Sequence, residues 1–143
     1  MKGQVALDFM FAIAIVALMV AGLVSFGNNM RVQTNMLNAQ ANLRILTISV
    51  GNDVTKVYAA GPGFTMKVQL PFKLQSGDQV NVTLNRTTDS VTVVGLLDGS
   101  VYETTLRLQV PLAKTTKVTL TPARTRFNVT ARMEEGVTSV EVH

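Results

Sequence analysis

Three asparagines carry the clearest chemical pattern in this sequence. Each begins an Asn-x-Thr triplet, namely Asn81-Val82-Thr83, Asn85-Arg86-Thr87 and Asn128-Val129-Thr130. This triplet is the acceptor for N-linked glycans and marks surface segments of exported proteins. These three are the only asparagines after residue 63, whereas none of the six asparagines between residues 28 and 52 begins such a triplet. We therefore predict that the three side chains carry glycans; the alternative is that they are only polar strand residues.

The side chains that catalysis or metal binding usually requires are scarce. The sequence has no cysteine, and its single histidine is the last residue, His143. Thiolate chemistry is therefore excluded, and His143 is the only candidate for the usual general base. Glu134 and Glu135 precede a glycine in a predicted turn, where carboxylates are normally solvated. We expect no enzyme activity, no cofactor and no metal site.

The chain is organised around an apolar run near its N-terminus. Residues 9–27 contain no charge, and Ser25 is their only polar side chain. At a rise of about 1.5 Å per residue, a helix over this run is about 28 Å long, which matches the hydrocarbon thickness of a bilayer. The run continues directly into an amphipathic segment, unlike a secretory signal peptide that is removed. The run therefore predicts a transmembrane helix.

Asp8 lies at the edge of this run. A carboxylate costs about 2.5–3.5 kcal/mol at the centre of a membrane, and less near the headgroups. One interpretation places Asp8 at the membrane boundary or near a helix N-terminus, where the helix dipole favours an acid. The other makes it a recognition or assembly residue. The residues alone leave both interpretations open.

The first nine residues carry a family resemblance. Lys2-Gly3-Gln4-Val5-Ala6-Leu7-Asp8-Phe9, followed directly by the apolar run, resembles the class III signal of archaeal type IV pilin-like proteins. The resemblance implies cleavage between Gly3 and Gln4, so that residues 1–3 are a leader and Asp8 is the fifth mature residue. The family usually has Glu at that place, and Ser where this chain has Ala6. Both differences keep the chemical type of the side chain.

The resemblance also implies a function. Such proteins are subunits of extracellular filaments, held in the cell membrane as precursors, and their apolar helices pack in the filament core. It implies a prepilin peptidase, an assembly ATPase and a membrane platform protein as partners. The predicted core residues are Phe9, Phe11, Ile13, Ile15, Val16, Leu18, Val20 and Leu23. Gly22 and Gly27 are predicted points of helix flexibility, because glycine costs about 1 kcal/mol against alanine in a helix.

Residues 28–60 continue the helix with an amphipathic pattern. Apolar residues recur three or four positions apart at Val32, Met36, Ala39, Leu43, Leu46, Val50, Val54 and Val57. Gly61-Pro62-Gly63 is a strong stop signal. We predict one helix over 4–60, with an apolar part at 4–27 and an amphipathic part at 28–60. The C-terminal half of the amphipathic stripe should pack on the rest of the chain, while the apolar part needs lipid or other helices.

Residues 64–143 show the period of two that is typical of strands. Alternating segments separated by turn signals lie at 64–72, 80–84, 91–93, 106–110, 118–120, 127–131 and 140–142. Pro71 and Pro111 place their strands at an edge or an end. The predicted fold is therefore α+β, a long N-terminal helix followed by an antiparallel β-sandwich-like domain.

Charge supports no specific binding to nucleic acid. The net charge of +4 is spread along the chain, and basic residues are interleaved with acids rather than with aromatics. The favoured function is a structural subunit of an extracellular filament at the cell surface. The alternatives are a monomeric, membrane-anchored surface binding protein, and a minor pilin or pseudopilus component.

Overall fold

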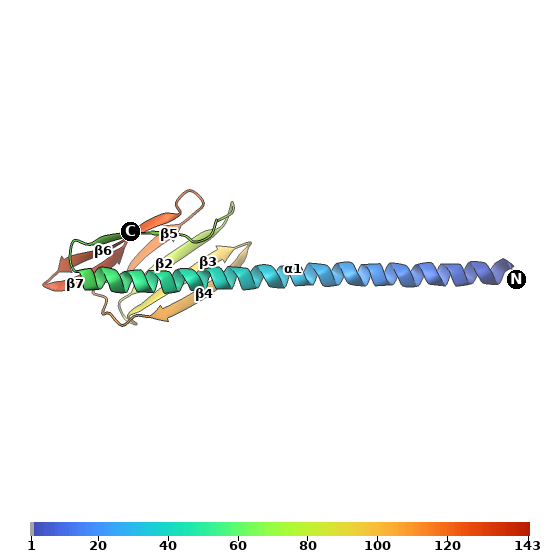
Figure 1. The fold of residues 1–143 in the computed structure, drawn as a ribbon, viewed down its shortest axis with the longest axis horizontal. Helices are drawn as coiled ribbons and strands as arrows, with labels where there is room; N and C mark the ends of the chain where they lie inside the picture. Colours follow the sequence, from blue (N-terminus) through green and yellow to red (C-terminus); the bar gives the residue numbers. More distant parts are fainter. Residues whose placement is uncertain (1) are drawn as a thin grey trace. The chain divides into compact units, whose positions relative to one another are not determined.

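The computed structural model describes the backbone of residues 2–143 and the side chains from Leu7 onward. Over that range one helix precedes seven strands (Figure 1), which confirms the predicted α+β class. The elements are α1 (Lys2–Ala60), β1 (Thr65–Gln69), β2 (Gln79–Asn85), β3 (Ser90–Leu97), β4 (Ser100–Arg107), β5 (Thr116–Leu120), β6 (Arg126–Glu134) and β7 (Val137–Val142).

The chain forms two compact units. The first ends at Asn38, and the second, which we call the globular unit, comprises Ala39–His143. Helix α1 contributes to both. The change occurs at Ala39 because this is the first residue of the amphipathic stripe to be partly buried against the core.

Helix α1 ends where the sequence predicted. No proline interrupts it, and the amide of Gly61 donates to the carbonyl oxygens of Val57 and Tyr58 at 3.3 and 3.2 Å. Gly61 and Gly63 have φ values of 89° and 90°, a conformation that side chains other than glycine rarely adopt. These bonds satisfy carbonyls that the end of a helix leaves free, and the chain then turns into β1.

Two antiparallel sheets make up the rest of the globular unit. Their strand orders are β1-β6-β7 and β4-β3-β2-β5. Asp98-Gly99 joins β3 to β4, and Glu135-Gly136 joins β6 to β7; all four residues have positive φ, as a tight hairpin turn requires. The sheets are linked by a hydrogen bond of 3.1 Å from the amide of Val142 to the Thr116 hydroxyl.

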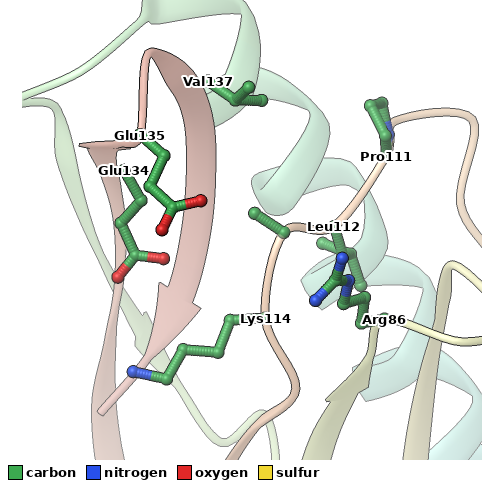
Figure 2. Close-up of a pocket in the computed structure, with 8 residues that line it drawn as sticks. Arg86, Pro111, Leu112, Lys114, Glu134, Glu135 and Val137 are labelled. Carbon is green, nitrogen blue, oxygen red and sulfur yellow. The ribbon is translucent and has the colours of Figure 1, made fainter.

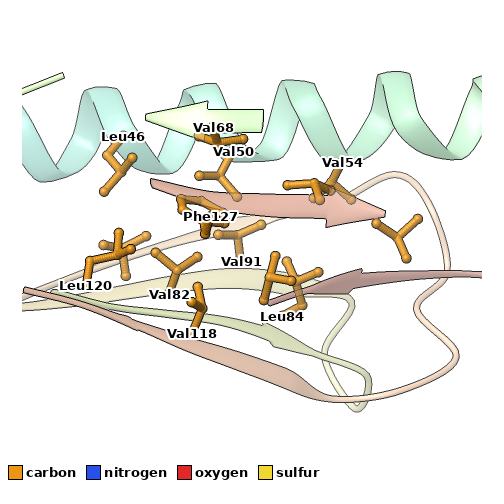
Figure 3. Packing of buried hydrophobic residues seen from close by; sticks show 14 of the residues in the cluster. Leu46, Val50, Val54, Val68, Val82, Leu84, Val91, Val118, Leu120 and Phe127 are labelled. Atoms are coloured by element: carbon orange, nitrogen blue, oxygen red, sulfur yellow. The ribbon is translucent and has the colours of Figure 1, made fainter. Parts of the chain in front are cut away.

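The core lies between the inner faces of the sheets and the C-terminal part of α1 (Figure 3). Strand β2 alternates strictly, and its fully buried residues are Val80, Val82 and Leu84. The predicted packing of the helix stripe on the sheet domain is confirmed. The five residues of the helix stripe from position 43 onward have no exposed surface, namely Leu43, Leu46, Val50, Val54 and Val57.

Two glycines set how closely α1 approaches the sheet. A Cβ added at Gly95 in β3 would lie 2.9 Å from Cδ1 of Leu43. A Cβ added at Gly51 in α1 would lie 2.6 Å from Cδ2 of Leu106. On helix propensity alone, Gly51 is a weak point of α1. In the structure it is instead a contact position, where the missing side chain makes room for β4.

The fourth strand differs from the prediction. The alternation at 106–110 suggested a strand there, but β4 covers Ser100–Arg107. The inward side chains of β4 are Tyr102, Thr104 and Leu106, and all three are only half-buried. An edge strand of this kind need not show an apolar alternation. Leu108 and Val110 are buried outside the strand, so their alternation reflects the core rather than sheet pairing.

Candidate functional site

The N-terminal part of α1 presents apolar side chains on every side. It contains a segment long and apolar enough to cross a membrane, and no part of that segment is buried by the chain itself. The eight predicted filament-core residues are 53–73% exposed in the single chain: Phe9, Phe11, Ile13, Ile15, Val16, Leu18, Val20 and Leu23. A helix of this composition needs lipid or neighbouring helices around it.

The predicted processing residues are only partly described. Asp8 lies in α1, and its side chain is exposed in the single chain. Gly3 and Gln4 fall within the bounds of α1, but the surroundings of Gly3 and the Gln4 side chain are not described, and neither is any part of Met1. Cleavage between Gly3 and Gln4 therefore stays a prediction.

Gly22 and Gly27 lie inside α1, which continues through both without interruption. Apart from the chain neighbours and the backbone of the adjoining helical turns, no atom lies within 4 Å of a Cβ added at either position. Neither glycine is therefore required by a close contact within the single chain. Their predicted role in helix flexibility stays a prediction, and the free space beside them is available to a neighbouring helix.

A second apolar stripe was missed in the sequence. Ala41, Ile45 and Ile48 lie on the side of α1 opposite the buried stripe, and the two isoleucines are 55% and 44% exposed. Their spacings of four and three place them on one helix face. The spacing is visible in the sequence, but this face also carries Asn52, and the buried stripe alone accounts for the amphipathic pattern. Folding of the globular unit leaves this stripe uncovered.

Two of the three Asn-x-Thr triplets begin on the outer face of β2. Asn81 and Asn85 are half-buried and alternate with the buried Val80, Val82 and Leu84. The Asn81 Oδ1 accepts hydrogen bonds from the Thr119 hydroxyl at 2.7 Å and from the side-chain Nε2 of Gln79 at 3.4 Å. These bonds hold the Asn81 amide against the centre of the sheet.

The other two sites differ in their surroundings. Asn85 ends β2, and its Oδ1 accepts a hydrogen bond of 2.9 Å from the amide of Thr87 in the turn. Asn128 lies in β6, in the other sheet, where it is half-buried and pairs with Lys67 of β1. The three sites are thus not brought together. Position on the outward face is compatible with glycans, and modification itself stays a prediction.

A groove in the globular unit has a volume of about 700 Å³ (Figure 2). Its charged lining residues are Arg86, Lys114, Glu134 and Glu135. The Lys114 amine lies 3.8 Å from a carboxylate oxygen of Glu141. Among residues 7–143, no group of three or more His, Asp or Glu side chains is arranged to hold a metal ion. No Ser, Thr, Cys or His side chain lines this groove, and we assign it no chemistry.

Comparison with known proteins adds no assignment. No protein-family model, no curated protein and no solved structure matches this chain. The functional argument therefore depends on the residues and their geometry.

Proposed function

We propose that this protein is a structural subunit of an archaeal type IV-like extracellular filament, assembled by packing of the apolar part of α1 between copies. The observation that carries the proposal is the set of exposed apolar side chains along α1. They surround the helix from Phe9 to Leu23, and they continue at Ile45 and Ile48 in the globular unit. Exposed apolar surface of this extent marks an interaction site.

The proposed assembly is an exchange of environments. The precursor is held in the cell membrane by residues 9–27, whose length fits the hydrocarbon layer. After cleavage the helix leaves the lipid and packs against its copies, so the burial of apolar surface is largely conserved. Contacts that do not close on themselves then extend the filament. By resemblance, the partners are a prepilin peptidase, an assembly ATPase and a membrane platform protein.

The second candidate is a monomeric surface protein permanently anchored in the membrane. The length of the apolar run, which fits the thickness of a bilayer, supports this candidate as well as it supports a filament subunit, because lipid alone would cover that segment. The stripe of Ala41, Ile45 and Ile48 discriminates between the two, because an anchored monomer leaves it in water. A minor pilin or pseudopilus component would assemble in the same way and differs only in its abundance in the filament.

The discriminating experiment places a charge on this stripe. Ile45→Lys and Ile48→Lys should leave the fold intact, since both side chains are at the surface, but lower the filament yield by about tenfold or more. Met133→Lys is the matched control, because Met133 is also an exposed apolar residue, 60% exposed, but lies on β6 and not on the helix. Sheared surface filaments are quantified by mass spectrometry, which also reports the N-terminus. Wild-type yield for both helix variants, or no filaments from the unaltered protein, would contradict the proposal.

Processing gives a separate test. The proposal expects mature subunits to begin at Gln4, and Gly3→Val to block cleavage because a side chain obstructs close backbone approach in the peptidase. Uncleaved precursor should then accumulate in membranes, where its mass identifies it. Filaments built from subunits that still begin at Met1 would contradict this step.

Asp8 has a physical role in the proposed assembly. Between packed helices its carboxylate loses water, so it must be paired, hydrogen-bonded or protonated. Cleavage creates an α-amino group at Gln4, one helical turn from Asp8, and a neighbouring subunit brings another. Asp8→Asn should be cleaved and inserted but form fewer filaments, and Asp8→Leu fewer still. If the peptidase reads Asp8 instead, both variants remain uncleaved; normal cleavage with normal yield would leave Asp8 without either role.

A further inference from the structure

Strand β4 is the least protected edge of the two sheets. Over residues 2–143 the strand orders leave four edges, namely β1, β7, β4 and β5. The edges β1 and β5 are five residues long and carry Lys67 and Lys117, and β7 carries Glu141 and is linked to β5. Strand β4 has eight residues, no proline, no lysine and no bulge in its pairing with β3, and its two charged residues, Glu103 and Arg107, have opposite signs. Short length, lysine, proline and bulges are the usual protections against edge pairing.

The backbone of β4 is ready to accept another strand. The two-residue turn makes Leu97 and Ser100 a hydrogen-bonded pair, so the even-numbered residues of β4 bond to β3. The bond of 2.7 Å from the Leu108 amide to the Asp89 carbonyl continues this pattern. The odd-numbered residues therefore direct their N–H and C=O groups to the free edge. These residues are Val101, Glu103, Thr105 and Arg107, and all four side chains are exposed.

The charges of β4 are complementary to those of a second copy in one register. If two β4 strands pair antiparallel with Thr105 opposite Thr105, Glu103 of each copy lies opposite Arg107 of the other. A register centred on Glu103 would place like charges opposite each other, which destabilises a pair. A register with Glu103 opposite Thr105 would leave both charges unmatched. The first register also joins odd-numbered residues to odd-numbered residues, as the free backbone groups require.

We propose that β4 is a self-association edge, at which two copies of this chain pair antiparallel about Thr105 and extend the four-stranded sheet across a two-fold axis. The occupant is a second copy rather than another protein, because the same strand supplies both opposite charges. A two-fold contact closes on itself and cannot extend a filament. The edge is therefore a contact separate from the helix packing of the proposed function, and it joins two chains whether or not filaments form.

The first test uses the absence of cysteine in the sequence. Thr105→Cys is introduced into the full chain in detergent micelles and oxidised. Opposite residues of a hydrogen-bonded pair have Cα atoms about 5.5 Å apart, within the range of a disulfide. The matched control is Lys117→Cys, also exposed on the outer face of an edge strand. We expect disulfide-linked dimers of the Thr105→Cys chain to form about tenfold faster than those of the control. Equal rates would overturn the proposal.

The second test identifies the register. In the Thr105→Cys chain, Glu103→Arg or Arg107→Glu alone should reduce crosslinking about tenfold, because each creates two pairs of like charges. The double variant Glu103→Arg/Arg107→Glu restores opposite pairs and should return to within about twofold of the starting rate. Both side chains are exposed, so an unchanged circular dichroism spectrum is expected throughout. Single reversals without effect, or a double variant that stays as slow as the single ones, would refute the pairing.

Discussion

The globular unit should fold without the apolar part of α1 but not without the amphipathic part. A chain that begins at Asn28 keeps the five buried helix residues, from Leu43 to Val57, against the sheets. A chain that begins at Phe64 loses all of them. We expect the first chain to be soluble and rich in β structure, and to self-associate only through β4. The second should aggregate through the uncovered inner sheet face.

The magnitude follows from burial. Each of the five side chains is a Leu or Val with no exposed surface. At about 1.5–3 kcal/mol for each buried aliphatic side chain, their removal costs about 8–15 kcal/mol. A domain of this size is stable by only about 5–15 kcal/mol in total, so the strands alone should not remain folded. The free energy for burying a valine lies near the lower end of this range. Even the lower total of about 8 kcal/mol exceeds the stability of a marginal domain.

Urea unfolding followed by circular dichroism, with size-exclusion chromatography, measures this effect. Val54→Ala in the chain that begins at Asn28 should lower the unfolding free energy by about 1–3 kcal/mol, because it leaves a cavity in the core. Thr55→Ala is the neighbouring control at an exposed position and should change it by less than about 1 kcal/mol. Equal folding of the two truncated chains would show that the helix does not hold the sheets together.

Three further changes probe single contacts and the predicted modification. Gly95→Ala should destabilise the globular unit by about 1–3 kcal/mol in urea unfolding, because its Cβ meets the fully buried Leu43; an unchanged midpoint would show that the core yields there. Ser139→Ala should stabilise it by about 1 kcal/mol, because the buried Ser139 hydroxyl has no hydrogen-bond partner within the described chain, and destabilisation would indicate an unseen partner. Protein from the native host should carry glycans on at least two of Asn81, Asn85 and Asn128, and an Asn→Gln change at each occupied site should remove one glycan mass; an intact mass equal to the bare polypeptide would contradict this.

The elements fixed by local chemistry were predictable from the sequence. The end of α1 follows from Gly61-Pro62-Gly63, because a glycine with positive φ and a proline cannot continue a helix. The hairpins at Asp98-Gly99 and Glu135-Gly136 follow from the residues that tight turns require. Burial on β2 follows from its alternation, since one face of the sheet meets the core. In each case the signal lies within a few neighbouring residues.

The features set by distant residues were not predictable. The close approach of Gly95 to Leu43 joins positions that only the folded chain brings together. The predicted bounds of β4 were wrong, because the inward side chains of this edge strand are mostly half-buried and its outward side chains are exposed. Its backbone pairs with one neighbour only, so neither of its faces needs a regular apolar period. The same lack of constraint leaves its free edge open to a second copy.

Only part of the proposed assembly surface on helix α1 could be predicted from the sequence. An amphipathic helix is normally read as one apolar stripe against one solvated face, and the stripe from Leu43 to Val57 satisfies that reading completely. A subunit that assembles needs a second apolar face on the same helix. In the sequence, the few apolar residues of that second face appear as isolated exceptions on the polar side. They can be recognised as a separate face only once the first face is known to be covered by the sheets. Ile45 and Ile48 become informative only because the structure shows the sheets using the opposite face. The exposed remainder of the helix is therefore the surface on which the filament proposal depends.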